Sequence, residues 1–473
     1  MERKLFSKVI MTMTAAAVMG LASCSNENDP MGGDLTPQGE PTSMKLVLDL
    51  SGGAYTRAIQ DANATEDEKK IKDLNVYIYD ANGIFEKEHT IQFVDLKEVV
   101  GQNNQYVTQN VLETTTGKKT IYVGANMTAG MKQIMKANSA QALAKKGVGA
   151  TLAEITNTDG FVMFSTTAAG NTFVATAEKQ PDNIPADNQV TVTLQRLAAK
   201  IAVGMTANLP GQDVQQGAAG NITDLGFLVD NINKMYYLTY GGVNGGKTPA
   251  ATDANMLVKD YDKAHFELAN WGADPQFKTI TPGTADKTGW STAYAAENLT
   301  TDKFIEGVTR IVVKGTFTPQ SGIQVGGNAP DYTFTETANH ITKGDDYYMF
   351  NLPEAGGYAF FNKTDGDDAA KVKAWLKHIG IADDQQDAVA KTKVLYTKGM
   401  NYWWITVDDN RGDITRNKFY RADITSIWAP GRNDGKFDDV KDKNDKVDEK
   451  TNITVQITVE PWTMKDFNAE LRP

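Results

Sequence analysis

Short runs in which apolar and polar residues alternate recur along this chain. The first run covers residues 44–50 and the second covers residues 74–79, with every second side chain apolar in each. This period of two places the apolar side chains on one face of a β-strand. Further strands are predicted at residues 120–123, 190–194, 201–205, 235–240, 310–317, 347–352, 402–407 and 419–427. Gly, Asn, Asp or Pro bounds most of these runs, which is typical of strands separated by turns.

Helical periodicity is confined to two places. Residues 131–146 form one patch, and Val372, Trp375, Leu376 and Ile379 form the i, i+3, i+4, i+7 face of a short amphipathic helix. Strands and helices do not alternate regularly along the chain. The sequence therefore predicts a mostly β protein of sandwich type with short helical insertions.

A domain boundary is predicted near Arg196. The strand run at residues 190–194 ends just before it, and residues 197–201 open another apolar run. A polar stretch at residues 210–220 follows and is expected to be a loop. The acidic, low-complexity stretch at residues 433–450 is expected to be a solvated loop or linker.

The N-terminus has the pattern of an export signal. A charged start containing Arg3, Lys4 and Lys8 precedes an apolar run at residues 9–22. That run is shorter than the roughly 20 residues that a membrane-spanning helix needs. It ends in the sequence Leu-Ala-Ser followed by Cys24, which resembles the lipobox of bacterial lipoproteins and implies acylation of the Cys24 sulfur. The alternative is an ordinary signal peptide followed by an incidental cysteine.

Composition argues against several classes of function. The 48 basic and 59 acidic residues give a formal net charge of -11, so broad binding of nucleic acid is not expected. Cys24 is the only cysteine, which excludes an internal disulfide or a zinc–cysteine cluster. The four histidines are scattered and the chain has no G-x-S-x-G elbow. We therefore expect no enzyme, no cofactor and no metal site.

Two patterns that often mark ligand sites are better explained as loops. Residues 241–248 (GGVNGGKT) match the Walker A sequence, but no amphipathic helix follows to present its amide groups to a phosphate. A glycine-rich hairpin loop is expected there instead. Acidic clusters at residues 365–366, 434–435 and 438–448 lack the ligand spacing of a calcium loop, so solvated loops are expected.

Aromatic residues suggest one alternative function. Trp403, Trp404 and Trp428 could stack on sugars, as in a glycan-binding module. Because neighbouring strand residues point to opposite faces, only one of Trp403 and Trp404 is expected to face the core. The simpler interpretation is therefore one core tryptophan and one interface tryptophan.

Several segments, in their order along the chain, resemble the Bacteroidales fimbrillin family, the type V pilins. They are the lipobox at Cys24, Arg57-Ala58, and residues 71–79, 117–123, 194–201, 416–420 and 459–462. Within the family, the sequence is most similar to the major shaft subunit of short fimbriae. Residues 241–345 lie outside this resemblance.

The resemblance implies two transthyretin-like β-sandwich domains and a structural, non-enzymatic role. Its expected divisions are a signal peptide at residues 1–23, a propeptide at 24–57, an N-terminal domain at 58–195 and a C-terminal domain at 196–473. The protein would reach the outer membrane as a lipoprotein, and an arginine-specific protease would cut between Arg57 and Ala58. Copies of the chain, with anchor and tip subunits, would then form a cell-surface fimbrium that mediates adhesion.

The strand pattern supports this route independently of the resemblance. Cutting at Arg57 would remove the tether at residues 25–43 and the strand at residues 44–50. The sandwich would be left with an apolar groove and unpaired backbone groups, which are a template for strand addition. Because strand donation between copies runs head to tail and does not close, it produces a filament.

The predicted donor lies in the C-terminal tail. Phe467, Ala469 and Leu471 alternate as the lost strand does, so the candidate is residues 463–473, alone or together with residues 452–459. The alternative is that the tail is the last strand of its own sandwich.

Two other functions stay open at this point. The chain could be a tip subunit, which needs no donor, or an anchor subunit, which should keep its first strand. It could instead be a lipid-anchored glycan-binding protein of the cell surface, which would have no reason to be cut at Arg57.

Overall fold

The protein was analysed as a computed structural model. It describes residues 39–50, 64–101, 105–143, 147–165, 169–205, 213–214, 218–230, 232–233, 235–238, 266–267, 277–281, 289–298, 308–352, 357–406, 414–427, 430–434 and 453–461. The ordered elements are mostly strands, with short helices between them. The predicted mostly β fold is therefore confirmed.

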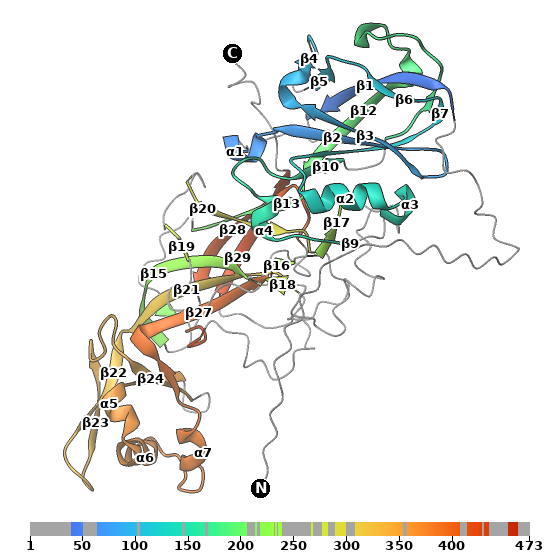
Figure 1. Ribbon diagram of the computed structural model, residues 1–473. Helices are drawn as coiled ribbons and strands as arrows, with labels where there is room; N and C mark the ends of the chain where they lie inside the picture. Colours follow the sequence, from blue (N-terminus) through green and yellow to red (C-terminus); the bar gives the residue numbers. More distant parts are fainter. Residues whose placement is uncertain are drawn as a thin grey trace, which may run out of the picture. The chain divides into compact units, whose positions relative to one another are not determined.

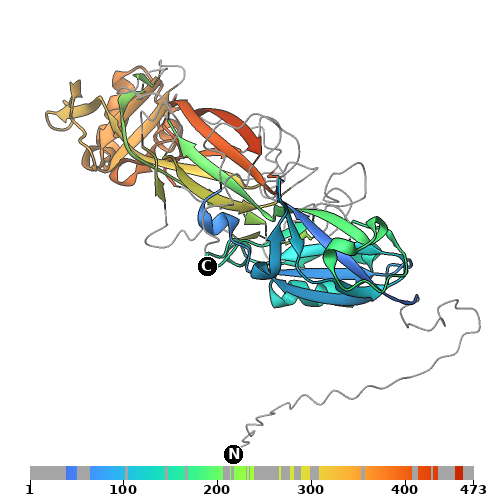
Figure 2. The same ribbon diagram turned by 90° about the horizontal axis from the view of Figure 1, so that it is seen from above.

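The N-terminal half is built on one nine-stranded sheet, whose blue and green strands lie together in both views (Figure 1, Figure 2). In spatial order its strands are β3 (Phe85–Gln92), β2 (Asp73–Tyr79), β8 (Thr120–Ala125), β10 (Met163–Ser165), β12 (Gln189–Arg196), β1 (Pro41–Asp49), β5 (Gln105–Thr108) and β4 (Leu96–Glu98), with β6 (Leu112–Thr115) also pairing with β1. Leu74, Val76 and Ile78 of β2 are buried, as their alternation predicts. Asn75, between them, is buried as well, so both faces of β2 are covered.

Short helices accompany this sheet. They are α1 (Glu66–Lys69), α2 (Ala129–Ala137), α3 (Ala140–Leu143) and α4 (Leu152–Ile155). Helix α2 begins at Thr128, whose side chain accepts a hydrogen bond from the Met131 backbone nitrogen, and it buries Met131 and Met135. The predicted helical patch at residues 131–146 is thus two short helices rather than one.

The C-terminal half adds two further sheets. One has the order β20 (Ser291–Ala296), β13 (Ala198–Gly204), β28 (Lys418–Ile427) and β29 (Ile453–Pro461). The other has the order β14 (Asp213–Val214), β15 (Ala218–Asp230), β21 (Arg310–Pro319) and β27 (Met400–Thr406), with β19 (Lys278–Thr279) also on β15. Ile201 of β13, Phe227 of β15 and Ile311 of β21 belong to one hydrophobic core, so the two sheets pack as a sandwich.

A smaller unit is inserted between β21 and β27 (Figure 1). It comprises β22 (Ser321–Gly326), β23 (Thr333–Ala338), β24 (Tyr347–Leu352), β25 (Gly357–Asn362), α5 (Lys363–Asp367), α6 (Ala369–His378), α7 (Gln386–Ala390) and β26 (Val394–Tyr396). Val372, Trp375 and Leu376 of α6 are buried in its core, which confirms the predicted amphipathic helix. Ile379 follows the helix as its C-cap residue.

One predicted loop is wrong. The stretch at residues 210–220 overlaps β15, a 13-residue strand that begins at Ala218. Its first residues are small or polar, and its pairing with β21 shifts register between Thr223 and Gly226, where Asp224 adopts a positive φ of 55°. The small and polar residues at its start carry no apolar alternation, and the bulge interrupts the period-two pattern farther along the strand.

Short pairings complete the described structure. β7 (Gly117–Lys118) pairs with β11 (Thr172–Phe173), β9 (Gly147–Gly149) with β17 (Met235–Tyr237), and β16 (Ile232–Asn233) with β18 (Phe266–Glu267). The predicted domain boundary at Arg196 coincides with the end of β12, directly before β13 begins at Ala198. Its role as a domain boundary stays a prediction.

Candidate functional site around the first strand

Strand β1 lies inside the N-terminal sheet with neighbours on both edges. On one edge it runs parallel to β12, from Lys45 opposite Gln189 to Asp49 opposite Thr193. On the other edge its first half pairs antiparallel with β6 and its second half with β5. Removing β1 would therefore leave unpaired backbone groups on three other strands.

The side chains of β1 fill the interior. Met44, Leu46 and Leu48 are fully buried and Leu50 is 1% exposed. The residues between them are half-buried, which confirms the predicted alternation along this strand. Burial of such side chains contributes about 1.5–3 kcal/mol each before ordering costs. β1 therefore occupies an apolar groove between its neighbouring strands in the sheet.

One end of this groove is polar. The Thr42 hydroxyl donates to the Val174 carbonyl oxygen at 2.7 Å and accepts from the Thr176 backbone nitrogen at 3.1 Å. The Asn188 side-chain nitrogen lies 3.2 Å from the same hydroxyl and 2.8 Å from the carbonyl oxygen of Ser43. Asn188 is fully buried and Thr42 is 5% exposed, whereas Val174 is 39% exposed, so the cluster extends from the interior to the surface.

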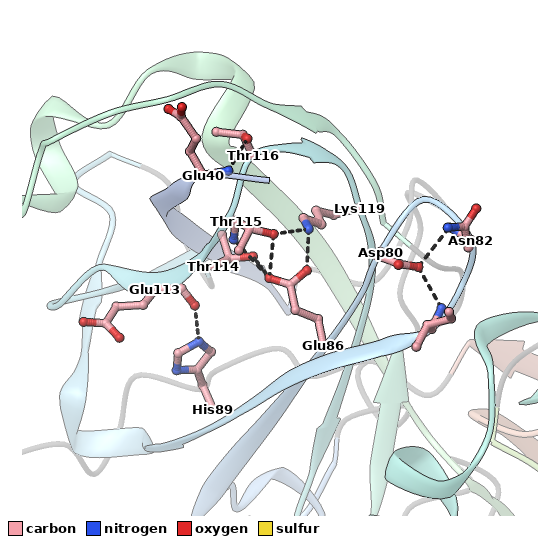
Figure 3. A network of polar contacts seen from close by, with 11 residues as sticks. Glu40, Asp80, Asn82, Glu86, His89, Glu113, Thr114, Thr115, Thr116 and Lys119 are labelled. Carbon is pink, nitrogen blue, oxygen red and sulfur yellow. Dashed lines mark hydrogen bonds and ion pairs between the residues drawn. The ribbon is translucent and has the colours of Figure 1, made fainter. Parts of the chain in front are cut away.

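Strand β6, which borders the groove, is fixed in position by the side chains of Glu86 on β3 and of Lys119 (Figure 3). Among the described strands, β6 forms a backbone ladder with β1 alone. A Glu86 carboxylate oxygen on β3 accepts from the Thr114 hydroxyl and from both the backbone nitrogen and hydroxyl of Thr115, each at 3.0 Å. The Lys119 ammonium pairs with Glu86 and donates to the Thr115 hydroxyl at 2.5 Å. The Lys119 and Glu86 side chains are 1% and 4% exposed, so this is a buried ion pair.

A second set of side-chain contacts connects β6 to β3. The His89 Nε2–H donates to the Glu113 carbonyl oxygen at 2.8 Å, and Figure 3 shows the ring directed at this oxygen. Burial of the imidazole lowers the pKa of His89 below its ordinary value. Lys87 and the Glu113 carboxylate form an exposed ion pair at 3.0 Å. These side-chain contacts with β3 do not involve β1.

Helix α1, the first described element after residue 63, is anchored by Glu68. Its carboxylate pairs with the Lys200 ammonium at 2.9 Å and accepts from the Tyr294 hydroxyl at 2.6 Å. Burial raises the pKa of Glu68, but Lys200 and Tyr294 outweigh it, so the pKa lies below its ordinary value. The Glu68 carbonyl oxygen accepts from Arg196 at 2.8 Å, and burial lowers the pKa of that guanidinium to about 10.

Two residues of the predicted 416–420 landmark have structural roles. Arg416 forms a buried ion pair with Glu297 at 2.6 Å. Asn417 has a positive φ of 55°, its side chain accepts from the Arg196 guanidinium at 3.2 Å, and its backbone nitrogen donates to the Ala198 carbonyl oxygen at 2.8 Å. These contacts connect the β12–β13 junction to the start of β28.

The predicted processing and donor residues lie outside the described part of the chain. These are Cys24, Arg57, Ala58, Phe467, Ala469 and Leu471. Residues 452–459 fall partly within β29, which pairs antiparallel with β28 of its own chain. The Walker-like residues 241–248 and Trp428 are also outside the described residues.

The predicted tryptophan pair is buried on both faces of β27. Trp403 is 3% exposed and belongs to the main core, as the alternation predicts for one of the two. Trp404 is 8% exposed on the opposite face, packed with Leu228 and Val312 and covered by the Arg432 guanidinium at 4.8 Å. The two rings lie on opposite faces of β27, as the alternation predicts, and a role of Trp404 at an interface stays a prediction. Neither ring offers a platform to a sugar.

Two of the three acidic clusters singled out for calcium contain residues paired with cations, and the third, residues 438–448, lies outside the described residues. Asp365 forms an ion pair with Lys371 at 2.7 Å, and Asp434 lies 3.6 Å from Arg432. Over the described residues, no three His, Cys, Asp or Glu side chains group in a way that could hold a metal ion. No helix within the described ranges is long and apolar enough to cross a membrane.

The polar residues that border the groove carry no sequence motif that predicts their role. Asn188 follows a Pro-rich loop with no motif, and Glu86 lies in a strand, β3, whose charged residues hide its alternation. Lys119 was noted only as part of the 117–123 resemblance. Their roles depend on neighbours distant in sequence, such as Thr42 at 146 positions from Asn188.

Two family models match this chain. The model described as "Major fimbrial subunit protein (FimA)" matches residues 42–196, and the one described as "Major fimbrial subunit protein type IV, Fimbrillin, C-terminal" matches residues 394–468. The first match covers the described sheet from β1 to the end of β12. No curated protein matches the sequence.

Solved structures with a similar chain course come from Parabacteroides distasonis and Porphyromonas gingivalis. A protein assigned to cell adhesion from Parabacteroides distasonis is 14% identical, with 89% of this chain and 97% of that chain covered and a TM-score of 0.44. The fimbrilin FimA of Porphyromonas gingivalis W83 is 13% identical, with 89% and 98% covered and a TM-score of 0.41. The tip fimbrial protein Mfa3 of Porphyromonas gingivalis, solved with a C-terminal truncation, is 12% identical, with 89% and 100% covered and a TM-score of 0.36.

Proposed function

Since the resemblance to the fimbrillin family is confirmed over residues 42–196 and 394–468, we propose that this protein is a structural subunit in the shaft of cell-surface fimbriae. In this proposal it is exported as a lipoprotein acylated at Cys24 and delivered to the outer membrane. An arginine-specific protease then cuts between Arg57 and Ala58. Processed copies polymerise by strand exchange, and the resulting fimbrium mediates adhesion together with anchor and tip subunits.

The position of β1 is the observation that supports this proposal most. A cut after Arg57 separates β1 from the rest of the chain, although β1 is paired on both edges and its apolar side chains are buried. Loss of such a strand leaves a groove that favours another strand of the same pattern. The proposed occupant is the C-terminal segment of a neighbouring copy, either residues 463–473 alone or these with residues 452–459.

Subunit class is part of the proposal. A shaft subunit needs both a removable first strand and a donor, and Arg57 and the alternating C-terminal residues provide both. An anchor subunit would keep β1, and a tip subunit would not need a donor. The glycan-binding alternative loses Trp403 and Trp404 as platforms, because both rings are buried.

Protease treatment of a soluble precursor tests the function. Residues 25–473, which lack the acylated cysteine, would be purified, treated with an arginine-specific protease and examined by N-terminal sequencing and electron microscopy. We expect a new N-terminus at Ala58 and filaments in the treated sample only. The Arg57→Ala variant, with β1 still attached, should remain a folded monomer under the same treatment. Filaments formed by uncut Arg57→Ala protein would contradict the proposal.

A further inference from the structure

The polar end of the groove matches the hydrogen-bonding capacity of one hydroxyl group. The Asn188 side-chain nitrogen and the Thr176 backbone nitrogen donate hydrogen bonds to the Thr42 hydroxyl oxygen. The Thr42 hydroxyl in turn donates a hydrogen bond to the Val174 carbonyl oxygen. A hydroxyl has one donor and two acceptor positions, so all three neighbours are satisfied by this single group. The neighbouring positions that β1 buries at 44, 46, 48 and 50 are all apolar.

This arrangement has supports that do not depend on β1. The Asn188 side-chain oxygen accepts from the Val174 backbone nitrogen at 2.8 Å, and its side-chain nitrogen donates to the Val174 carbonyl oxygen at 2.9 Å. The carboxamide is thus fixed by both polar groups of one backbone residue. When β1 leaves, these two bonds remain and hold the Asn188 amide toward the vacated Thr42 position.

We propose that Asn188, the Val174 carbonyl and the Thr176 amide form a hydroxyl-recognising subsite that sets the register of the strand entering the groove. The inference rests on the proposed strand exchange. A Ser or Thr of the incoming strand satisfies all three groups. An apolar residue of the same shape loses the three hydrogen bonds of the hydroxyl and leaves the Thr176 amide without this acceptor, and a carboxylate cannot donate to the Val174 oxygen.

The subsite also selects among strands of this chain. The required spacing is a hydroxyl residue followed at every second position by four apolar residues, as in Thr42, Met44, Leu46, Leu48 and Leu50. From residue 414 onward this spacing occurs once, at Thr451, Ile453, Val455, Ile457 and Val459. Thr463 is followed two positions later by Lys465, a charged residue where the groove is apolar. The subsite therefore assigns residues 451–459 to the groove.

The assigned strand lies where leaving its own sheet breaks one backbone ladder, the one with β28. Residues 453–461 form β29, which pairs with β28 alone among the described strands and lies at the edge of its sheet. An edge strand loses one ladder when it leaves, whereas a central strand loses two. The tail that follows β29 would extend beyond the part of the groove that β1 fills.

Peptide binding to the processed subunit tests the subsite without changing the fold of the protein. Processed protein beginning at Ala58 would be titrated with a labelled peptide of residues 40–50 and with its Thr42→Ser and Thr42→Val forms. We expect the Ser form to bind within about threefold of the parent peptide. The Val form should bind at least about tenfold more weakly, because the three hydrogen bonds of the Thr42 hydroxyl are lost. A peptide with Val47→Thr, which changes hydroxyl content away from the subsite, is the matched control and should bind within about threefold.

The outcomes separate the two proposals. Equal binding of the Thr42→Val and parent peptides would overturn the subsite while leaving strand exchange intact. Failure of the parent peptide to bind processed protein would overturn strand exchange and the subsite with it. In processed protein carrying Asn188→Leu, the difference between the Thr and Val peptides should fall to within about threefold, which assigns the effect to Asn188.

Competition with unlabelled peptides tests the register. A peptide of residues 450–461 should displace the labelled strand, and its Thr451→Val form should do so at least about tenfold less well. A peptide of residues 463–473 should displace it poorly. Displacement by residues 463–473 but not by residues 450–461 would overturn the assignment of residues 451–459.

Discussion

At the scale of single residues, polar groups rather than apolar ones keep the groove in shape. The buried pair of Glu86 and Lys119 fixes β6, whose backbone ladder within the described structure is with β1 alone. Buried ion pairs contribute little net stability when intact, but removing one partner leaves an uncompensated charge. The pair should therefore matter both to folding and to the shape of the empty groove.

Glu86→Gln tests this role. We expect the precursor to lose about 3–5 kcal/mol of unfolding free energy in urea, because Lys119 stays buried without its counter-charge. Lys87→Met, which breaks the exposed pair with Glu113 next to it on β3, should cost at most about 1 kcal/mol. Equal losses in the two variants would contradict a special role for the buried pair.

At the scale of elements, alternation predicted strands that present at least one apolar face, including β2 and β28, whose ladders also shift register. The run predicted at residues 44–50 is β1, displaced by only a few residues, and α6 has the predicted buried face. β15 was not predicted because its first residues are small or polar, and β3 because its half-buried residues are mostly charged. A sequence pattern reflects burial along one element, so it does not reveal a neighbouring strand that covers a charged side chain.

The apolar residues of the candidate site were predictable from the sequence, and its polar residues were not. Met44, Leu46, Leu48 and Leu50 were identified as a buried row from their spacing alone. Asn188 could not be, because its partner Thr42 lies 146 positions away in the sequence and its partner Val174, which follows β11, lies 14 positions away. Trp404 shows the same limit, since the Arg432 that covers it comes from a separate segment.

The element-scale prediction concerns β1 as an occupant of the groove. Leu48→Asp places a charge at a fully buried position, which is strongly unfavourable in an apolar groove. We expect β1 of the uncut precursor to dissociate from the sheet, so that the protein binds the labelled peptide of residues 40–50 without protease treatment. Val47→Asp, at a half-buried position of the same strand, is the control and should keep the groove closed. An uncut Leu48→Asp protein that folds and excludes the peptide would contradict the model of β1 as a displaceable strand.

At the scale of the whole molecule, the proposed strand exchange would make each subunit a donor and an acceptor at different sites. Such a contact joins two different surfaces and does not close on itself, so assembly would continue until one of the two sites is lacking. In this proposal, processing controls only the acceptor, because cleavage at Arg57 would empty the groove and leave the C-terminal segment unchanged. Donor and acceptor functions can therefore be separated by substitution.

This separation predicts that Arg57→Ala protein terminates growing filaments. It retains β1 in its groove and cannot accept a strand, but it can donate its own C-terminal segment to the last processed subunit. Added in increasing proportion to processed wild-type protein, it should shorten the filaments progressively, as measured by electron microscopy. The matched control combines Arg57→Ala with deletion of residues 451–473, which removes the donor, and it should leave filament length unchanged. Equal shortening by both proteins would show that the C-terminal segment is not the donor, and no shortening by either would show that an occupied groove does not block growth.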